Sequence, residues 1–307
     1  MILHRRNTEP EIAFRIAGEM IPNNGEDCSF LSVGEDRSLV SVFDGCGGIG
    51  SRRYENFSGK TGAYVSARAI CGAVQAWFES GQEDPGPQID RALHIISSYG
   101  DKGRGLRGSL HKDFPTTAVI ATAQREGNHL NIDCFWAGDS RAYLLTPRGL
   151  HQLTRDDVSN SDALDNLSDD GVLTNVISAS LPFDLHRHRV RVAQPAIVIA
   201  ATDGCFGYLK TPMHFEAVLL KTMLCAQSIA EWKAHLQQEI AEHAGDDYSL
   251  CLIGYGFSDF SDVKAAFDSR GEELIRDYIA PMTKEDTMVN ELWQSYREGY
   301  YAYCKDA

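Results

Sequence analysis

Residues 39–45 read Leu-Val-Ser-Val-Phe-Asp-Gly, an apolar run that ends in an acid followed by a glycine. Residues 196–204 repeat this arrangement as Ala-Ile-Val-Ile-Ala-Ala-Thr-Asp-Gly. A β-strand holds its last residue rigidly, and the glycine lets the chain turn away, so the carboxylates of Asp44 and Asp203 are free to face a ligand. Both stretches therefore predict a strand with a functional carboxylate at its end.

Three further acidic groups stand beside strand-like runs. They are Glu26 with Asp27, Asp139 within residues 136–141, and Asp246 with Asp247 before the apolar residues 248–253. Carboxylates that gather without Lys or Arg among them repel one another unless a cation holds them. We therefore predict that these acidic groups converge on a site for a hard divalent metal ion.

Composition limits the other classes of function. The chain has 307 residues, 43% of them hydrophobic, which is enough for a large core in one domain or in two small ones. The formal net charge of −14 argues against a nucleic-acid backbone or an anionic membrane as partner. The nearest approach to a basic patch, residues 104–112, is short and rich in glycine, and we expect it to be a solvated loop.

Location and redox state follow from simple patterns. No run of about 18 apolar residues occurs, and the first residues lack the apolar core of a signal peptide, so we expect a cytoplasmic protein. The eight cysteines show no C-x-x-C spacing, and several lie in apolar patterns. We expect buried, reduced thiols, and zinc is disfavoured.

The order of the predicted elements is typical of an α+β protein. Strand-like runs dominate residues 11–45, and further strands are expected at 116–123, 130–137, 141–146, 150–153, 187–192, 196–202 and 248–256. Helical periodicity predicts paired helices at residues 59–79 and 87–99, and again at 212–225 and 228–242. Consecutive strands with short connections and paired helices predict antiparallel sheets covered by helical layers. The polar residues 155–171 show no periodicity and are expected to form an exposed flap.

The last fifty residues are predicted to be helical, at about 262–280 and 284–305. Five aromatic residues crowd the second of these helices: Trp293, Tyr296, Tyr300, Tyr301 and Tyr303. Two interpretations remain open, packing against the core or a surface for a partner or a second copy of the chain.

Each acidic motif alone is weak evidence, since Asp-Gly after a strand is most often a hairpin turn. Together and in order, however, the motifs over residues 11–256 resemble those of the PPM, or type 2C, metal-dependent protein phosphatases. The seven stretches, with the family pattern that each resembles, are residues 23–27 (N-E-D), 42–48 (D-G-x-G-G), 116–118 (G-T-T-A), 138–144 (G-D-S-R-x-Y-L), 153–156 (L-T-x-D), 202–204 (S-D-G) and 246–249 (D-N-x-T).

The resemblance implies a four-layer α-β-β-α sandwich of two antiparallel sheets flanked by helices. Residues 1–257 would form the catalytic domain, and residues 258–307 a helical extension packed on or beside it. It also implies a centre of two Mn²⁺ or Mg²⁺ ions, with a weaker third. By position Asp44 would bridge both ions, Glu26 and the Gly45 carbonyl would serve one, Asp203 and Asp246 the other, and Asp139 the third.

The implied activity is that of a phosphoprotein serine/threonine phosphatase. Two ions about 3.5–4 Å apart lower the pKa of a water, which then attacks the phosphoester in line without a phosphoenzyme. Asp44, Asp203 and Asp246 are the residues on which this chemistry would depend.

The sequence departs from the family pattern around the substrate phosphate. Many members carry an Arg four residues before the Glu of the N-E-D motif, whereas this chain has Pro22 there and an inserted Gly25. Arg52 or Arg53 would have to bind the phosphate instead, and the competing interpretation is that both are merely solvated.

Other departures leave the proposed ligands in place. Cys46 stands where some members have a His that protonates the leaving oxygen, so water is the expected proton donor. Pro115 replaces the first Gly of the G-T-T-A strand. Asp27 and Asp247 are additional candidate ligands, although alignment favours Asp246 over Asp247.

Three hypotheses remain. The first is the phosphatase, and the second is a catalytically weak relative that binds a phosphoprotein or partner and regulates by occupancy. Loss of the phosphate-binding Arg favours the second, but a chain freed from catalysis has no reason to keep so many acids close together. A small-molecule phosphoesterase is the third, and no Gly-rich phosphate loop supports it.

Overall fold

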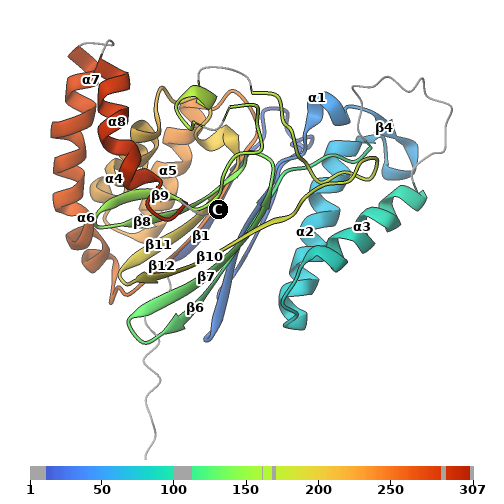
Figure 1. Ribbon diagram of the computed structural model, residues 1–307, viewed down its shortest axis with the longest axis horizontal. Helices are drawn as coiled ribbons and strands as arrows, with labels where there is room; N and C mark the ends of the chain where they lie inside the picture. Colours follow the sequence, from blue (N-terminus) through green and yellow to red (C-terminus); the bar gives the residue numbers. More distant parts are fainter. Residues whose placement is uncertain (1–11, 100–112, 161, 168–170, 285–287, 305–307) are drawn as a thin grey trace, which may run out of the picture.

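The computed structural model describes residues 12–99, 113–160, 162–167, 171–284 and 288–304. Two five-stranded antiparallel sheets form its centre (Figure 1). The first has the order β1-β12-β11-β8-β9, with the bounds Ala13–Gly18, Tyr248–Tyr255, Ala196–Ala201, Arg141–Thr146 and Gly149–Gln152. The second has the order β10-β7-β6-β3-β2, with the bounds His186–Ala193, His129–Ala137, Ala118–Glu126, Arg37–Phe43 and Cys28–Ser32.

Helices cover the outer face of each sheet (Figure 1). Helices α2 (Gly62–Ser80) and α3 (Gly86–Tyr99) lie on the second sheet, and α4 (Pro212–Cys225) and α5 (Ile229–His243) lie on the first. Alternate side chains of the strands fill a third apolar layer between the sheets, including Val42, Leu144 and Val198. The predicted α+β class and four-layer α-β-β-α sandwich are confirmed.

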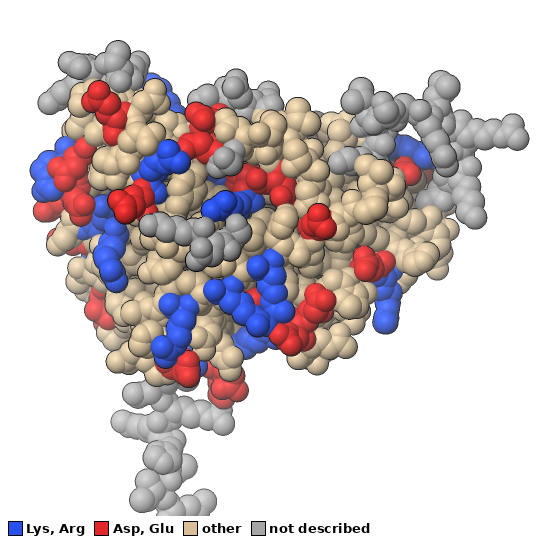
Figure 2. Space-filling view, viewed as in Figure 1, with Lys and Arg blue, Asp and Glu red and all other residues tan. Residues whose placement is uncertain are grey.

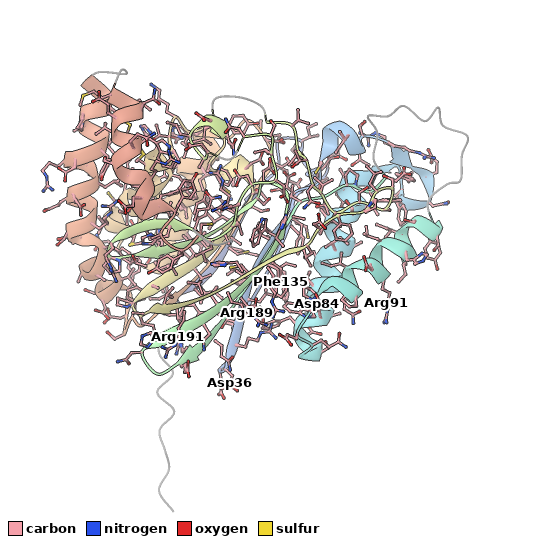
Figure 3. The ribbon with its side chains drawn as sticks, viewed as in Figure 1. Asp36, Asp84, Arg91, Phe135, Arg189 and Arg191 are labelled. Carbon is pink, nitrogen blue, oxygen red and sulfur yellow. The ribbon has the colours of Figure 1, made fainter. Side chains whose placement is uncertain are left out.

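Helix α2 shows how local sequence fixes an element. The hydroxyl of Thr61 accepts a hydrogen bond from the backbone N–H of Tyr64 at the N-terminus, and Gly81 ends the helix at a φ of 70°, in the left-handed region. Its buried face recurs at helical spacing, and Trp77 packs edge-on against Phe135 of β7 at 5.8 Å (Figure 3). The helix is thereby fixed over the second sheet.

The C-terminal residues form a further helical layer beside α4. Helix α6 (Phe260–Leu274) continues through a π-helical turn (Ile275–Ile279) into α7 (Ala280–Lys284), and α8 (Val289–Tyr300) returns across β9. Trp293, Tyr296 and Tyr300 of α8 are buried in the same core as the first sheet and α4. Of the two interpretations for the aromatic residues, core packing accounts for these three.

Residues 155–171 differ from the predicted exposed flap. They contain a short 3₁₀ turn, Asp165–Leu167, and Ala163 and Leu164 are only 1% and 6% exposed. The prediction of an exposed flap is wrong for these two residues because they pack in a core that also contains α8, more than a hundred residues later, and such a contact leaves no periodic signal in the flap itself.

Three further predictions concern the basic loop, the cysteines and membrane-spanning helices. The expected basic loop at 104–112 falls outside the described residues. The eight cysteines all lie within the described ranges and are free thiols, but only five are buried: Cys28 and Cys46 are half-buried, and Cys225, at the last residue of α4, is exposed. Among the helices that the structure describes, none is long and apolar enough to cross a membrane.

Candidate functional site

The acidic residues lie where strands of both sheets end or begin. Asp44 follows β3, Asp203 follows β11, and Asp139 follows β7 after a tight turn. Two acidic pairs, at residues 26–27 and 246–247, precede β2 and β12. The antiparallel register places Cys28 opposite Phe43 and Ala201 opposite Leu250, so segments far apart in sequence meet at one end of the sandwich.

These carboxylates influence one another strongly. Burial raises the pKa of Asp44 well above its usual range, and Asp203, Asp27, Asp139 and Asp246 raise it further, in that order. Burial, followed by the charge of Asp246, raises the pKa of Asp203 to about 6. The site is therefore a group of acids whose charged forms are disfavoured until positive charge is added.

The end of β3 is held by neighbouring backbone and hydroxyl groups. The hydroxyl of Thr116 and the N–H of Thr117 each donate to the Asp44 carbonyl oxygen at 2.8 Å, and the Asp44 N–H donates to the Thr117 hydroxyl at 3.2 Å. A Cβ at Gly45 would lie 2.6 Å from the Ala63 carbonyl oxygen. Only glycine fits there, and the Asp44 side chain is thus presented from a fixed support.

Asp139 has a buried oxygen without a partner. Its Oδ1 accepts no hydrogen bond from any residue that the structure describes. Burial raises its pKa well above the usual value, and Asp203 and Asp156 raise it further. An unsatisfied buried carboxylate oxygen is costly, and a bound cation would satisfy it.

Within the two acidic pairs, at residues 26–27 and 246–247, the carboxylates have different hydrogen-bond partners. Both carboxylate oxygens of Asp247 accept backbone N–H groups, from Met20 and Glu26, each at 2.7 Å. Asp246 is exposed, and it accepts the Asp247 N–H at 2.7 Å. Asp27 accepts the hydroxyl of Thr202 at 2.8 Å. Asp247 therefore acts in the turn that joins the two segments.

Two pockets open beside these carboxylates. The first, of about 220 Å³, is lined by residues that include Glu26, Asp246 and Asp247. The second, of about 180 Å³, is lined by Asp139 and Asp203 together with residues of the flap. Since the charge of Asp246 has the largest electrostatic effect on the pKa of Asp203, we take both pockets to border the same group of carboxylates.

The two candidate phosphate-binding arginines separate in the structure. Arg53 lines the first pocket and donates to the Gly59 carbonyl oxygen at 3.0 Å. Arg52 stacks over Tyr54 at 4.9 Å and approaches Asp113 at 3.8 Å, and it does not line that pocket.

Sequence reasoning missed a second cation of the first pocket. Lys60 lines it together with Arg53 and donates to Asn24 Oδ1 at 3.0 Å. No local pattern in the sequence signals this position, because Lys60 is brought back beside Arg53 by the pairing of β4 (Arg53–Tyr54) with β5 (Lys60–Thr61).

The donor set fits a hard divalent ion. Within the described ranges no group of three or more His, Cys, Asp or Glu side chains is already arranged to hold a metal ion. Uncompensated carboxylates repel, so they do not draw in to the distances of about 2.0–2.2 Å at which they coordinate such ions. The oxygen-only donors and the orphaned Asp139 oxygen are nevertheless what Mn²⁺ or Mg²⁺ would need.

A larger pocket, of about 540 Å³, lies on the outer face of the second sheet, below the end of α2. Arg189 and Arg191 of β10 line it and are labelled in Figure 3. Figure 2, in the same view, shows several basic side chains below its centre, with acidic side chains beside them. Arg189 shares Asp133 and Glu83 with Arg187, at N–O distances that include 3.2 Å to Asp133. Because these basic side chains are already paired with acids, the acidic end remains the candidate site.

Comparisons with known proteins address the fold. No family model matches the chain, and no curated protein matches its sequence. Solved structures do match. Stp1, a serine/threonine phosphatase from Staphylococcus aureus, has 14% identity and a TM-score of 0.58, over 80% of this chain and 94% of its own. The PPM Ser-Thr phosphatase MsPP from Mycobacterium smegmatis has 11% identity and a TM-score of 0.55, over 80% and 98%.

The catalytic domain of the phosphatase PstP, crystallised in complex with two manganese ions, has 15% identity and a TM-score of 0.51, over 79% of this chain and 96% of its own. At such low identity these likenesses show the fold. The chain has the fold of PPM-type serine/threonine phosphatases, and the resemblance predicted from the motifs is confirmed at that level.

Proposed function

We propose that this protein is a metal-dependent phosphoprotein phosphatase acting on phosphoserine or phosphothreonine, with the activity in residues 1–257. The observation that carries the proposal is the convergence of Asp44, Asp139 and Asp203: burial raises the pKa of all three, the charge of Asp203 raises those of Asp44 and Asp139 further, and the charge of Asp246 raises that of Asp203. Such a group is unfavourable unless it binds cations.

The proposed ligands are Glu26, Asp44, the Gly45 carbonyl, Asp203 and Asp246, with Asp139 for a weaker third ion. The hydrogen bonds that occupy Asp247 support Asp246 as the ligand of that pair. Asp27 accepts a hydrogen bond from Thr202, the residue before Asp203, and would thereby help to position that ligand. When bound, two Mn²⁺ or Mg²⁺ ions would supply an activated water and stabilise charge on the phosphoryl oxygens.

This chain's own residues would orient the substrate. Arg53 and Lys60 line the pocket beside Glu26, and we assign them the phosphate in place of the missing Arg at Pro22. The Cys46 thiol lies 3.9 Å from the Asp44 carbonyl oxygen, where it is held against the backbone. We therefore assign protonation of the leaving oxygen to solvent.

Hydrolysis of a phosphothreonine peptide tests this function. We expect turnover with Mn²⁺, none with a chelator, and a loss of more than about 100-fold in Asp203→Asn, since a missing ligand disables activation of water. Asp36→Asn, an exposed acid on the loop before β3, is the matched control and should keep full activity. Turnover that persists in chelator would exclude the mechanism.

A regulatory module without turnover is the second candidate. The observation in its favour is that Pro22 is exposed and that both cations already donate hydrogen bonds within the protein, Arg53 to the Gly59 carbonyl oxygen and Lys60 to Asn24 Oδ1. Such a module would bind the phosphopeptide in the presence of Mn²⁺ with no release of phosphate. Measured phosphate release that Asp203→Asn abolishes would decide against it.

A further inference from the structure

Helix α8 holds the flap through its tryptophan. The indole N–H of Trp293 donates to Asp162 Oδ1 at 2.9 Å, and Trp293 is only 2% exposed. Arg297, one turn later, approaches the other oxygen of the same carboxylate at 3.3 Å. Asp162 Oδ1 also accepts the Leu164 N–H at 2.9 Å, so one carboxylate links α8 to the turn of the flap.

Residues just after α8 add a second and a third attachment. The hydroxyl of Tyr301 accepts the backbone N–H of Ala163 at 2.8 Å. The guanidinium of Arg155 donates twice to the Cys304 carbonyl oxygen, at 3.2 and 2.8 Å. The flap is therefore attached to α8 and the residues after it at two places: at Arg155, the first residue of the flap, and at residues 162–163 in its middle.

The same stretch of flap forms a wall of the acidic site. Val158, Asn166 and Leu167 line the 180 Å³ pocket together with Asp139 and Asp203. Hydrogen bonds connect this wall to the interior of the site in two steps: Asn166 donates to Asp156 at 3.0 Å, and Asp156 pairs with the buried Arg141 at 2.6 Å.

Few contacts other than those with α8 and the residues after it would keep this part of the flap ordered. Its residues are mostly polar, and ordering each one costs about 1–2 kcal/mol of backbone entropy. The apolar residues Ala163 and Leu164 are buried in the core that contains α8, and the hydrogen bonds above fix their position. Since the phosphate is assigned to the first pocket, beside Arg53 and Lys60, we infer that the residues of an extended peptide would continue along this wall of the second pocket, and that a small aryl phosphate would contact it less.

We propose that α8 determines substrate specificity: Trp293 and Tyr301 are positioning residues that set the flap wall against which the protein part of a phosphoprotein lies. The proposal rests on the function proposed above. It assigns residues 258–307 a part in recognition, in addition to their part in the core.

The double variant Trp293→Phe with Tyr301→Phe tests this, because it removes one N–H and one hydroxyl and keeps an aromatic ring at each position, although the ring at position 293 becomes smaller. We expect KM for a phosphothreonine peptide to rise about tenfold with kcat within about twofold. Hydrolysis of a small aryl phosphate should stay within about twofold. The matched control is Trp232→Phe, since the Trp232 N–H lies buried in the same core and meets no partner among the described residues.

Hydrogen exchange of residues 154–167 gives a readout independent of activity. Faster exchange there in the double variant, and unchanged exchange in Trp232→Phe, is the expected result. If the unmodified protein hydrolyses no phosphoester, the proposed function fails while the exchange experiment still tests the attachment. Unchanged exchange overturns the proposal, and so does an equal loss on the peptide and the small substrate.

Discussion

Two regions of this molecule bury carboxylates and treat them in opposite ways. Glu216 of α4 is 0% exposed, and Arg270 of α6 donates to its two oxygens at 2.8 and 2.9 Å. The Tyr296 hydroxyl adds a third bond to this carboxylate at 2.6 Å. At the acidic end, by contrast, the largest charged influences on Asp44 are four other carboxylates. The fold neutralises charge where it builds core, and leaves it uncompensated where we propose that a cation binds.

The Arg141–Asp156 pair lies at the border between the two regions. It is buried and bidentate, with distances of 2.6 to 3.1 Å, and it lines the pocket that holds Asp139. Burial alone would lower the pKa of Arg141, but its pairing with Asp156 raises it well above the usual value. The charge of Arg141 therefore lies beside the acidic site but is already neutralised by Asp156.

The largest expected effect comes from breaking the paired region. Arg270→Met leaves the Glu216 carboxylate buried without its cation, which should lower the free energy of unfolding by about 3–5 kcal/mol. Denaturant titration measures this loss. Arg276→Met, which breaks an exposed pair with Asp277, is the control and should cost about 0–1 kcal/mol. A similar small cost for both variants would remove the contrast between the regions.

At the acidic end we expect a smaller change in the free energy of unfolding, and in the opposite direction. Asp44→Asn removes one charge from a group of like charges, so the metal-free variant should be at least as stable as the unmodified protein. Mn²⁺ at 100 times its Kd should stabilise the unmodified protein by about 2.7 kcal/mol and the variant far less. Thermal unfolding with and without Mn²⁺ measures both. A metal-free Asp44→Asn protein destabilised as much as Arg270→Met would show that Asp44 is structural.

The smallest expected effect is on pH dependence. The pKa of Asp203 is raised to about 6 in the folded state, so folding favours its protonated form. The stability that this contributes is fully present below the unfolded pKa of about 3.9 and is lost as pH rises through about 6. Denaturant titrations of metal-free protein at pH 4.5, 5.5 and 6.5 should show this fall, and Asp203→Asn should show less of it. Equal slopes for both proteins would mean that Asp203 is not perturbed.

Local patterns predicted much of this structure because they reflect local physics. The alternation in β10, the apolar run of β12, the helical spacing in α2 and the Asp-Gly ends of β3 and β11 each lie within a few consecutive residues. Predicted and observed bounds accordingly differ by only a few residues, and α4 was placed at residues 212–225 as observed. The ligand roles of the acids stay a prediction until metal binding is measured.

Other features could not be predicted, because the groups that create them are distant in sequence. Lys60 reaches the first pocket only through the pairing of β4 with β5, and the flap is held by a helix whose attachments lie at residues 293–304. Arg52 and Arg53 are adjacent and chemically identical, and the direction of the chain at that ribbon places only Arg53 beside Glu26.

The sequence by itself determined the strands, the helices and which strand ends carry acids, because apolar periodicity and turn chemistry act between near neighbours. Tertiary structure alone decided which charges are paired, which acid of each pair faces the pocket, and what supports the flap. Electrostatic energy and burial depend on distances through space, and those distances exist only once the two sheets and the C-terminal helices have packed together.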